Sequence, residues 1–90
     1  MSYQYNTILP SATPVVLTNE ELSTITTCTF HTIEISGSST IIELKIANNA
    51  DYVTITSIAD DIENINAIGI TSLRLTSSGG ASMSIAGIKQ

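Results

Sequence analysis

Apolar and polar residues alternate along most of this 90-residue chain, with the period of two that is typical of β-strands. The clearest run covers residues 40–47, where Ile42, Leu44 and Ile46 point to one face and the residues between them to the other. Residues 52–57 alternate in the same way. Segments rich in serine, glycine or asparagine bound both runs and supply turns, so each run predicts one strand.

The same pattern predicts further strands on both sides of these runs. Turn signals recur at intervals of roughly 8–12 residues, which is typical of an all-β sandwich or barrel. We therefore expect a mainly β fold, a compact antiparallel β-sandwich or barrel of about six to seven short strands. Short connections predict a meander of 33–36, 40–47 and 52–57, and a hairpin of 70–76 with 81–86.

The inward phase of the strand-like segment before the meander is ambiguous. Cys28 and Phe30 fall on one face of a regular strand, whereas Ile33 and Ile35 fall on the other. Either a bulge near residues 31–32 resets the phase, or both faces of the strand are covered.

One window, near 58–68, has a helical period instead. Ile58, Ile62 and Ile65 follow the i, i+4, i+7 spacing that gathers side chains on one helical face. The preceding serine can serve as the N-cap and the following glycine as the C′ residue. We expect a short helix that packs its isoleucines on the sheet, and Ile62→Asp is then expected to unfold the domain.

The N-terminal segment is set apart by its prolines. Pro10 and Pro14 argue against a central strand, so residues 1–13 are expected to form an extended arm or edge segment, and 14–90 a single β domain. Such an arm either anchors on a neighbouring subunit or folds over its own domain. The arm residues expected at an interface are apolar or aromatic: Tyr3, Tyr5, Ile8 and Leu9.

Composition points to association with other proteins. Isoleucine accounts for 15 residues and serine with threonine for 25, while charged residues make up only 12% of the chain. Globular domains typically carry roughly 25% charged residues. A domain this small would therefore expose much Thr, Ser and Ile, which suits contact with other copies or a larger assembly.

Charge and targeting signals exclude several classes. The net charge is −5, and the basic side chains, Lys45, Arg74 and Lys89, form no cluster that could neutralise nucleic-acid phosphates. The first residues show neither a basic region nor an apolar stretch, so we expect no secretory signal, and no apolar run approaches the ~18 residues of a membrane span. We therefore expect no nucleic-acid or membrane partner and synthesis in a cytoplasm. Cys28 is the only cysteine, which leaves no intrachain disulfide.

No combination of residues predicts catalysis. Cys28, His31 and Glu34 contain the residue types of a nucleophile, a base and an acid. At strand spacing, however, Cys28 and Glu34 lie on the face opposite His31, and no nucleophile turn supports the trio. We expect no enzyme and no catalytic residue.

The densest group of side-chain oxygens is not expected to bind a metal. Asp60, Asp61, Glu63 and Asn64 lie in the predicted helix, where consecutive side chains diverge instead of converging on a calcium ion. A solvated acidic face explains them, so we expect no metal and no cofactor. Glycan binding remains an alternative without a specific motif, because a sugar platform needs a patch of exposed aromatic residues.

The segment 70–88 is rich in Thr, Ser and Gly, and it resembles the hairpins common in small bacteriophage virion proteins. The isoleucine-rich, tryptophan-free, acidic character of the whole chain is similar to theirs. This resemblance implies a non-enzymatic structural protein located in the virion, such as a capsid decoration (cement) protein or a small tail or fibre component. It implies a homo-oligomer, often a trimer, with the major capsid or another virion protein as partner. The alternative is a receptor- or glycan-binding module of a tail fibre or spike.

Overall fold

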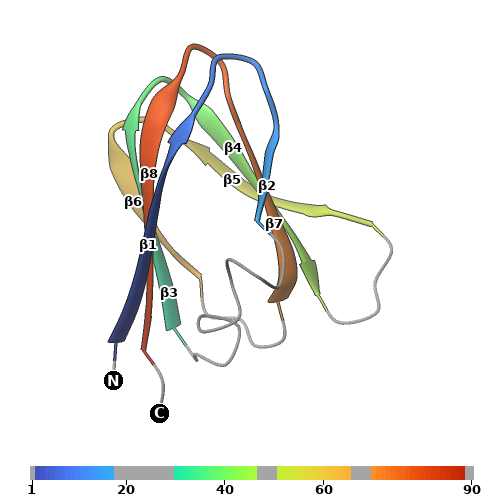
Figure 1. Cartoon of the computed structure of the whole chain (residues 1–90). Coiled ribbons are helices and arrows are strands. Elements are labelled where there is room, and N and C mark those ends of the chain that lie inside the picture. Colours follow the sequence, from blue (N-terminus) through green and yellow to red (C-terminus); the bar gives the residue numbers. More distant parts are fainter. Residues whose placement is uncertain (1, 18–29, 47–50, 66–69, 89–90) are drawn as a thin grey trace.

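The computed structural model describes residues 2–17, 30–46, 51–65 and 70–88. These residues form eight strands and no helix, so none of them belongs to a helix long and apolar enough to cross a membrane. The strands are β1 (Ser2–Leu9), β2 (Val15–Leu17), β3 (Phe30–Gly37), β4 (Thr40–Ile46), β5 (Val53–Ile58), β6 (Asp61–Ile65), β7 (Ile70–Ser77) and β8 (Ala81–Ile88) (Figure 1).

The strands form two antiparallel sheets that pack face to face. Sheet A has the order β1-β8-β3-β6, and sheet B has the order β2-β7-β4-β5. Four of the antiparallel pairs are nested, so that each pair lies between the two strands of the previous pair along the chain: β1–β8, β2–β7, β3–β6 and β4–β5. This nesting is the topology of an eight-stranded jelly roll, so the expected β-sandwich is confirmed.

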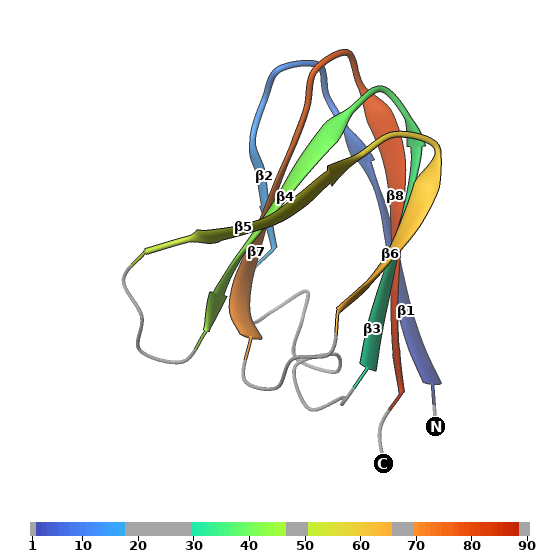
Figure 2. The ribbon, with the colours of Figure 1, turned by 180° about the vertical axis from the view of Figure 1, so that it is seen from behind.

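Four short turns carry the chain from one sheet to the other, and all four lie at the same end of the sandwich (Figures 1 and 2). Backbone hydrogen bonds tie these turns together: the Ser38 N–H donates to the Gly80 carbonyl over 3.1 Å, and the Ser78 N–H donates to the Ser39 carbonyl over 2.8 Å. These two hydrogen bonds join the β3–β4 turn to the β7–β8 turn at this end of the sandwich.

Alternating residues from both sheets fill the core, as the sequence pattern predicts. Ile42 and Leu44 of β4 point inward, as expected. The buried apolar residues, each at most 6% exposed, are Leu9, Leu17, Ile33, Ile35, Ile42, Leu44, Ile65, Ile70, Leu73, Leu75, Met83 and Ile85.

The helix expected near 58–68 is wrong for the residues that the structure describes. β5 ends at Ile58 and β6 begins at Asp61, with a turn between them in which Asp60 has a φ of 48°. The Asp60 carboxylate accepts a hydrogen bond of 2.8 Å from the Gly37 N–H, which holds that turn against the β3–β4 turn. Ile65 is buried, but Ile62 is 50% exposed, so the basis for expecting Ile62→Asp to unfold the domain is removed. Residues 66–68 lie outside the described part.

Two predicted strand pairings are also wrong, although their strands exist. β4 pairs with β5 as expected, but β3 lies in the other sheet, between β8 and β6. β7 and β8 are likewise split between the sheets, so their buried residues meet across the core instead of along a hairpin. The registers of β3 with both neighbours run without a break, which excludes the bulge considered near residues 31–32.

The segment 1–13, expected as an extended arm or edge segment, contributes the edge strand of sheet A. β1 pairs with β8 over its full length, from Ser2 opposite Ile88 to Leu9 opposite Ala81. Beyond Pro10, the Ala12 N–H donates a hydrogen bond of 2.7 Å to the Ser77 carbonyl and guides the chain into sheet B. The first strand is thus joined to the sandwich by a complete hydrogen-bond ladder.

Candidate functional site

Four residues were expected at an interface, and the structure places them differently. Ile8 is 70% exposed on the outer face of β1, which suits that role. Tyr5 is half-buried and packs against the core, and Leu9 is fully buried, so Leu9 cannot contact a partner while the strand is in place. Tyr3 lies in β1 opposite Gly87, and its side chain is outside the described part. Strand alternation explains the split between Ile8 and its neighbours, but it applies only once β1 is recognised as a strand.

The outer face of sheet A carries a shallow depression of about 390 Å³. Its floor is formed by small side chains of β8 and β3, including Ser82, Ser84 and Ser36, because larger residues in these strands point into the core. The Gln4 amide donates a hydrogen bond of 3.0 Å to the Ser84 hydroxyl beside it. Ile8 and Met83 also line the depression, so it offers a mainly apolar surface with a few hydroxyl, amide and carboxylate groups, the last from Glu34.

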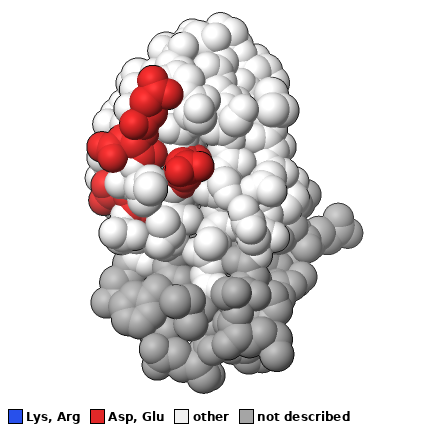
Figure 3. Space-filling view, turned by 90° about the vertical axis from the view of Figure 1, so that its left-hand side faces the viewer, with Lys and Arg blue, Asp and Glu red and all other residues white. Residues whose placement is uncertain are grey.

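Acidic side chains gather toward one margin of the same face, where Figure 3 shows Asp and Glu together and no Lys or Arg in its described part. They belong to β3, β6 and the turn before β6: Glu34, Asp60, Asp61 and Glu63. A second hollow of about 360 Å³ lies between the first three. No group of three His, Cys, Asp or Glu among the described residues is arranged to hold a metal ion. We define this margin as the acidic edge of sheet A.

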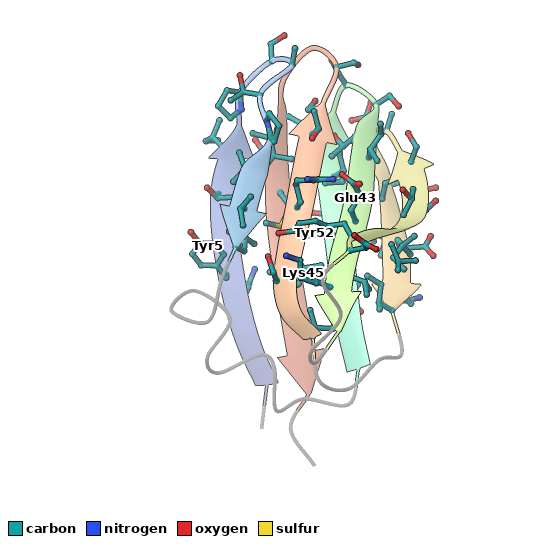
Figure 4. The ribbon with its side chains drawn as sticks, turned by 90° about the vertical axis from the view of Figure 1, so that its right-hand side faces the viewer. Tyr5, Glu43, Lys45 and Tyr52 are labelled. Carbon is teal, nitrogen blue, oxygen red and sulfur yellow. The ribbon has the colours of Figure 1, made fainter. Side chains whose placement is uncertain are left out.

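The outer face of sheet B is organised around Arg74 of β7. Its guanidinium donates two hydrogen bonds, of 2.9 and 2.8 Å, to the Glu43 carboxylate on the neighbouring β4. The same guanidinium lies 4.2 Å from the centre of the Tyr52 ring, and the Lys45 ammonium lies 4.6 Å from it. The Tyr52 hydroxyl shares a hydrogen bond of 2.6 Å with Ser72, and Figure 4 shows its side chain crossing the sheet between Glu43 and Lys45.

Arg74 changes the protonation of its partner. Its hydrogen bonds and positive charge lower the pKa of Glu43 below the ordinary value of 4.5, against a smaller opposing effect of desolvation. Glu43 in turn raises the pKa of Arg74. The carboxylate is therefore held ionised and paired, which suits it to fixing β4 against β7 and not to accepting a substrate proton.

Exposed aliphatic residues surround this polar cluster, and sequence analysis did not single them out. Val53 is also exposed, but it is paired with the inward-facing Leu44 and so lies on the other face of the sheet. The outer-face residues lie on β2, β4 and β5 with exposures between 38% and 45%: Val16, Ile41 and Ile55. We name this set the sheet B aliphatic surface. Val16 and Ile41 alternate with buried neighbours and so lie on the outer face, a signal that the alternation at 40–47 already contained.

The trio considered for catalysis is only partly described. Glu34 is exposed on the outer face of β3. His31 lies in the same strand, opposite Gly87 and Ile65, but its side chain is outside the described part, and so is Cys28. The prediction that this chain is not an enzyme therefore stays a prediction.

Comparison with known proteins finds similarity at the level of structure. No family model matches the chain, and no curated protein does. The crystal structure of the Yersinia pseudotuberculosis-derived mitogen is similar with a TM-score of 0.56 and 11% identity, covering 100% of this chain and 86% of that one. A structure of Bacillus endospore appendages, a family of disulfide-linked pili, gives a TM-score of 0.46 and 9% identity over 99% and 89% of the two chains. The second value is too low to support a conclusion. The first shows that this chain shares the mitogen's all-β sandwich fold.

Proposed function

We propose that this protein is a non-enzymatic structural component of a virus particle, a decoration protein that binds across neighbouring capsid subunits. The sheet B aliphatic surface is the observation that carries the proposal. Three large aliphatic side chains stay between 38% and 45% exposed on the outer face of one sheet of a small domain, whose chain has only 12% charged residues. Aliphatic side chains left exposed on one face of a sheet can anchor contact with another protein.

The fold supports a role based on contact. Jelly rolls serve as viral capsid and lectin domains, although the fold alone does not decide function. The Arg74–Glu43 pair and the Tyr52 ring stiffen the outer face of sheet B around the aliphatic residues. A pre-organised face loses little conformational entropy when it binds, which favours attachment to a repeated flat surface.

In this proposal the N-terminal segment is part of the β-sandwich and is not a detachable arm that holds a neighbouring subunit. Because Leu9 lies in the core, Tyr5 packs against it and β1 pairs with β8, removal of residues 1–13 would strip a strand from sheet A. If that deletion abolished capsid attachment, the loss would follow from damage to the fold and would not show that the segment contacts the capsid. Single substitutions at exposed isoleucines test the proposal without this ambiguity.

The test is co-sedimentation with expanded capsids assembled from the major capsid protein of the same genome. The wild type should bind saturably in a fixed ratio to capsid subunits. Ile41→Lys, on the sheet B aliphatic surface, should bind at least tenfold more weakly, whereas Ile62→Lys, on sheet A, makes the same chemical change and should bind like the wild type. Failure of the wild type to sediment would refute the proposed function, and equal binding by both variants would refute the assigned surface.

A glycan-binding module is the second candidate, and the sheet A depression favours it. Its hydroxyl groups and the Glu34 carboxylate are the partners that sugar hydroxyls require. A glycan array separates the two functions. Binding that Glu34→Ala abolishes and Ile41→Lys leaves intact would support this candidate over capsid decoration.

A further inference from the structure

The four edge strands of the sandwich differ in how well they are protected against pairing with another chain. β2 has three residues and follows Pro14, and β6 carries Asp61 and Glu63. In β5 the register with β4 breaks at Ile55, which leaves that residue unpaired in a bulge. Short length, proline, charge and bulges are the features by which natural sheets block edge pairing.

β1 has none of these features. It is eight residues long, contains no charged residue or proline, and pairs with β8 from end to end without a break. No strand of the described part pairs with its other side, because β1 is the last strand of sheet A. Alternate backbone N–H and C=O groups along the outer side of β1 are therefore available to pair with one further strand.

The charge distribution indicates which strand fits this template. The protein is acidic overall, so two copies repel each other unless their negative groups stay apart. The acidic residues of sheet A lie on β6, on the turn before it and, in the case of Glu34, on the neighbouring β3, so they are two to three strands away from β1. Pairing through β6 would bring Asp61 and Glu63 of both copies together, whereas pairing through β1 places the two acidic edges at opposite ends.

We propose that β1 pairs antiparallel with β1 of a second copy across a two-fold axis, joining the two sheets A into one sheet of eight strands. Seven strand spacings of ~4.8 Å would then separate the two acidic edges by about 34 Å. That is more than three times the Debye length of ~10 Å at 0.1 M salt, so their repulsion is screened. An isologous pair of this kind closes on itself and does not extend into a fibre.

The symmetry has a consequence for attachment. The two-fold axis is perpendicular to the joined sheet. Both sheets B therefore lie on the same side of the joined sheet, and both sheet B aliphatic surfaces face in the same direction. Two such surfaces can engage neighbouring capsid subunits together, with a gain in avidity. In this respect the inference rests on the proposed function and names the partner through which the decoration protein would bridge subunits.

Ile8 reports on the interface. The two-fold axis brings outer-face residues of one β1 opposite outer-face residues of the other, so Ile8 faces Gln4 or Ser2 of the second copy when the strand centres align. Ile8 is 70% exposed in the single chain, and a second β1 beside it would cover part of its side chain. A lysine there leaves the sandwich intact but adds an edge charge to each copy.

Light scattering coupled to gel filtration tests the proposal. The wild type should show about twice the 9.5 kDa of one chain and should dissociate on dilution. Ile8→Lys should raise the dissociation constant at least tenfold, and Asn6→Lys, a second outer-face change in β1, should act in the same direction. Ile62→Lys, which adds the same charge at the other edge of sheet A, should remain dimeric. A monomeric or trimeric wild type, or equal dissociation of Ile8→Lys and Ile62→Lys, would overturn it.

The two proposals fail separately. Ile41→Lys should remain dimeric while losing capsid binding, since it lies on sheet B. A dimer that never binds capsids would refute the decoration role and leave the β1 interface standing. A monomer that binds capsids would refute the β1 interface and leave the decoration role standing. Amide hydrogen exchange of residues 2–9 gives an independent readout, because their protection should rise with protein concentration only if β1 is the interface.

Discussion

At the scale of single residues, isoleucine serves both to fill the core and to cover the surface. Ile33 and Ile35 are at most 1% exposed, whereas Ile8, Ile41 and Ile62 are between 44% and 70% exposed. Residue type alone therefore does not separate core from surface in this chain. The position of each residue within its strand does, because alternate residues of a strand point to opposite faces.

Truncation of isoleucines should reveal this division. Ile33→Ala removes buried methyl groups and leaves a cavity, so it should lower the free energy of unfolding by about 2–5 kcal/mol. Ile62→Ala should change it by no more than about 0.5 kcal/mol, since the side chain is half exposed. Urea denaturation of both variants checks this. A large loss in Ile62→Ala would restore the sequence-based assignment of that residue to the core.

Glu43 should give stability a dependence on acid. Its pKa is lowered in the folded protein, so it stabilises the fold above the ordinary pKa of 4.5, and this contribution disappears as the pH falls through its lower folded value. The effect is small because the ion pair is partly exposed, and salt should weaken it. Urea unfolding from pH 6 down to pH 3 should show the wild type approaching Glu43→Gln in stability as the pH decreases. A constant difference between them would contradict the pairing with Arg74.

At the scale of elements, alternation was sufficient to predict most strands, but it could not assign their partners. The sequence near 58–68 predicts a helix because isoleucines at 58, 62 and 65 match a helical period, whereas Ile58 and Ile65 belong to two strands joined by a turn. Asp60 tolerates the positive φ of that turn, which is a local signal that favoured two strands. The sheet crossings depend on contacts far apart in the chain, and no local pattern reports them.

Gly37 should be needed at one of these crossings. Its φ is 132°, and an added Cβ would lie 2.8 Å from the Gly80 carbonyl oxygen, so Gly37→Ala should cost more than about 1 kcal/mol of unfolding free energy. Gly79→Ala is the matched control in the neighbouring turn. Its Cβ would approach the Ser38 hydroxyl, which can rotate away, so its cost should be smaller. Thermal unfolding of both variants tests the difference, and equal losses would contradict the close approach of the two turns.

At the scale of the whole molecule, the sandwich separates its surfaces by character. Sheet A has an uncharged edge at β1 and an acidic edge at β6, and sheet B carries the Arg74–Glu43 pair among exposed aliphatic residues. Of the interface residues expected from sequence, Ile8 alone is strongly exposed in the described part, and the sheet B aliphatic surface was missed. Its members come from three strands, so they form a common surface only after the strand order is known.

An electron cryo-microscopy map of the assembled particle tests the central claim most directly. It should show this chain on the capsid in two-fold pairs joined at β1, with both sheet B aliphatic surfaces against neighbouring capsid subunits. A particle without this chain would contradict the proposed function. Copies bound through the acidic edge of sheet A, or arranged as trimers with β1 exposed, would contradict the assigned surfaces.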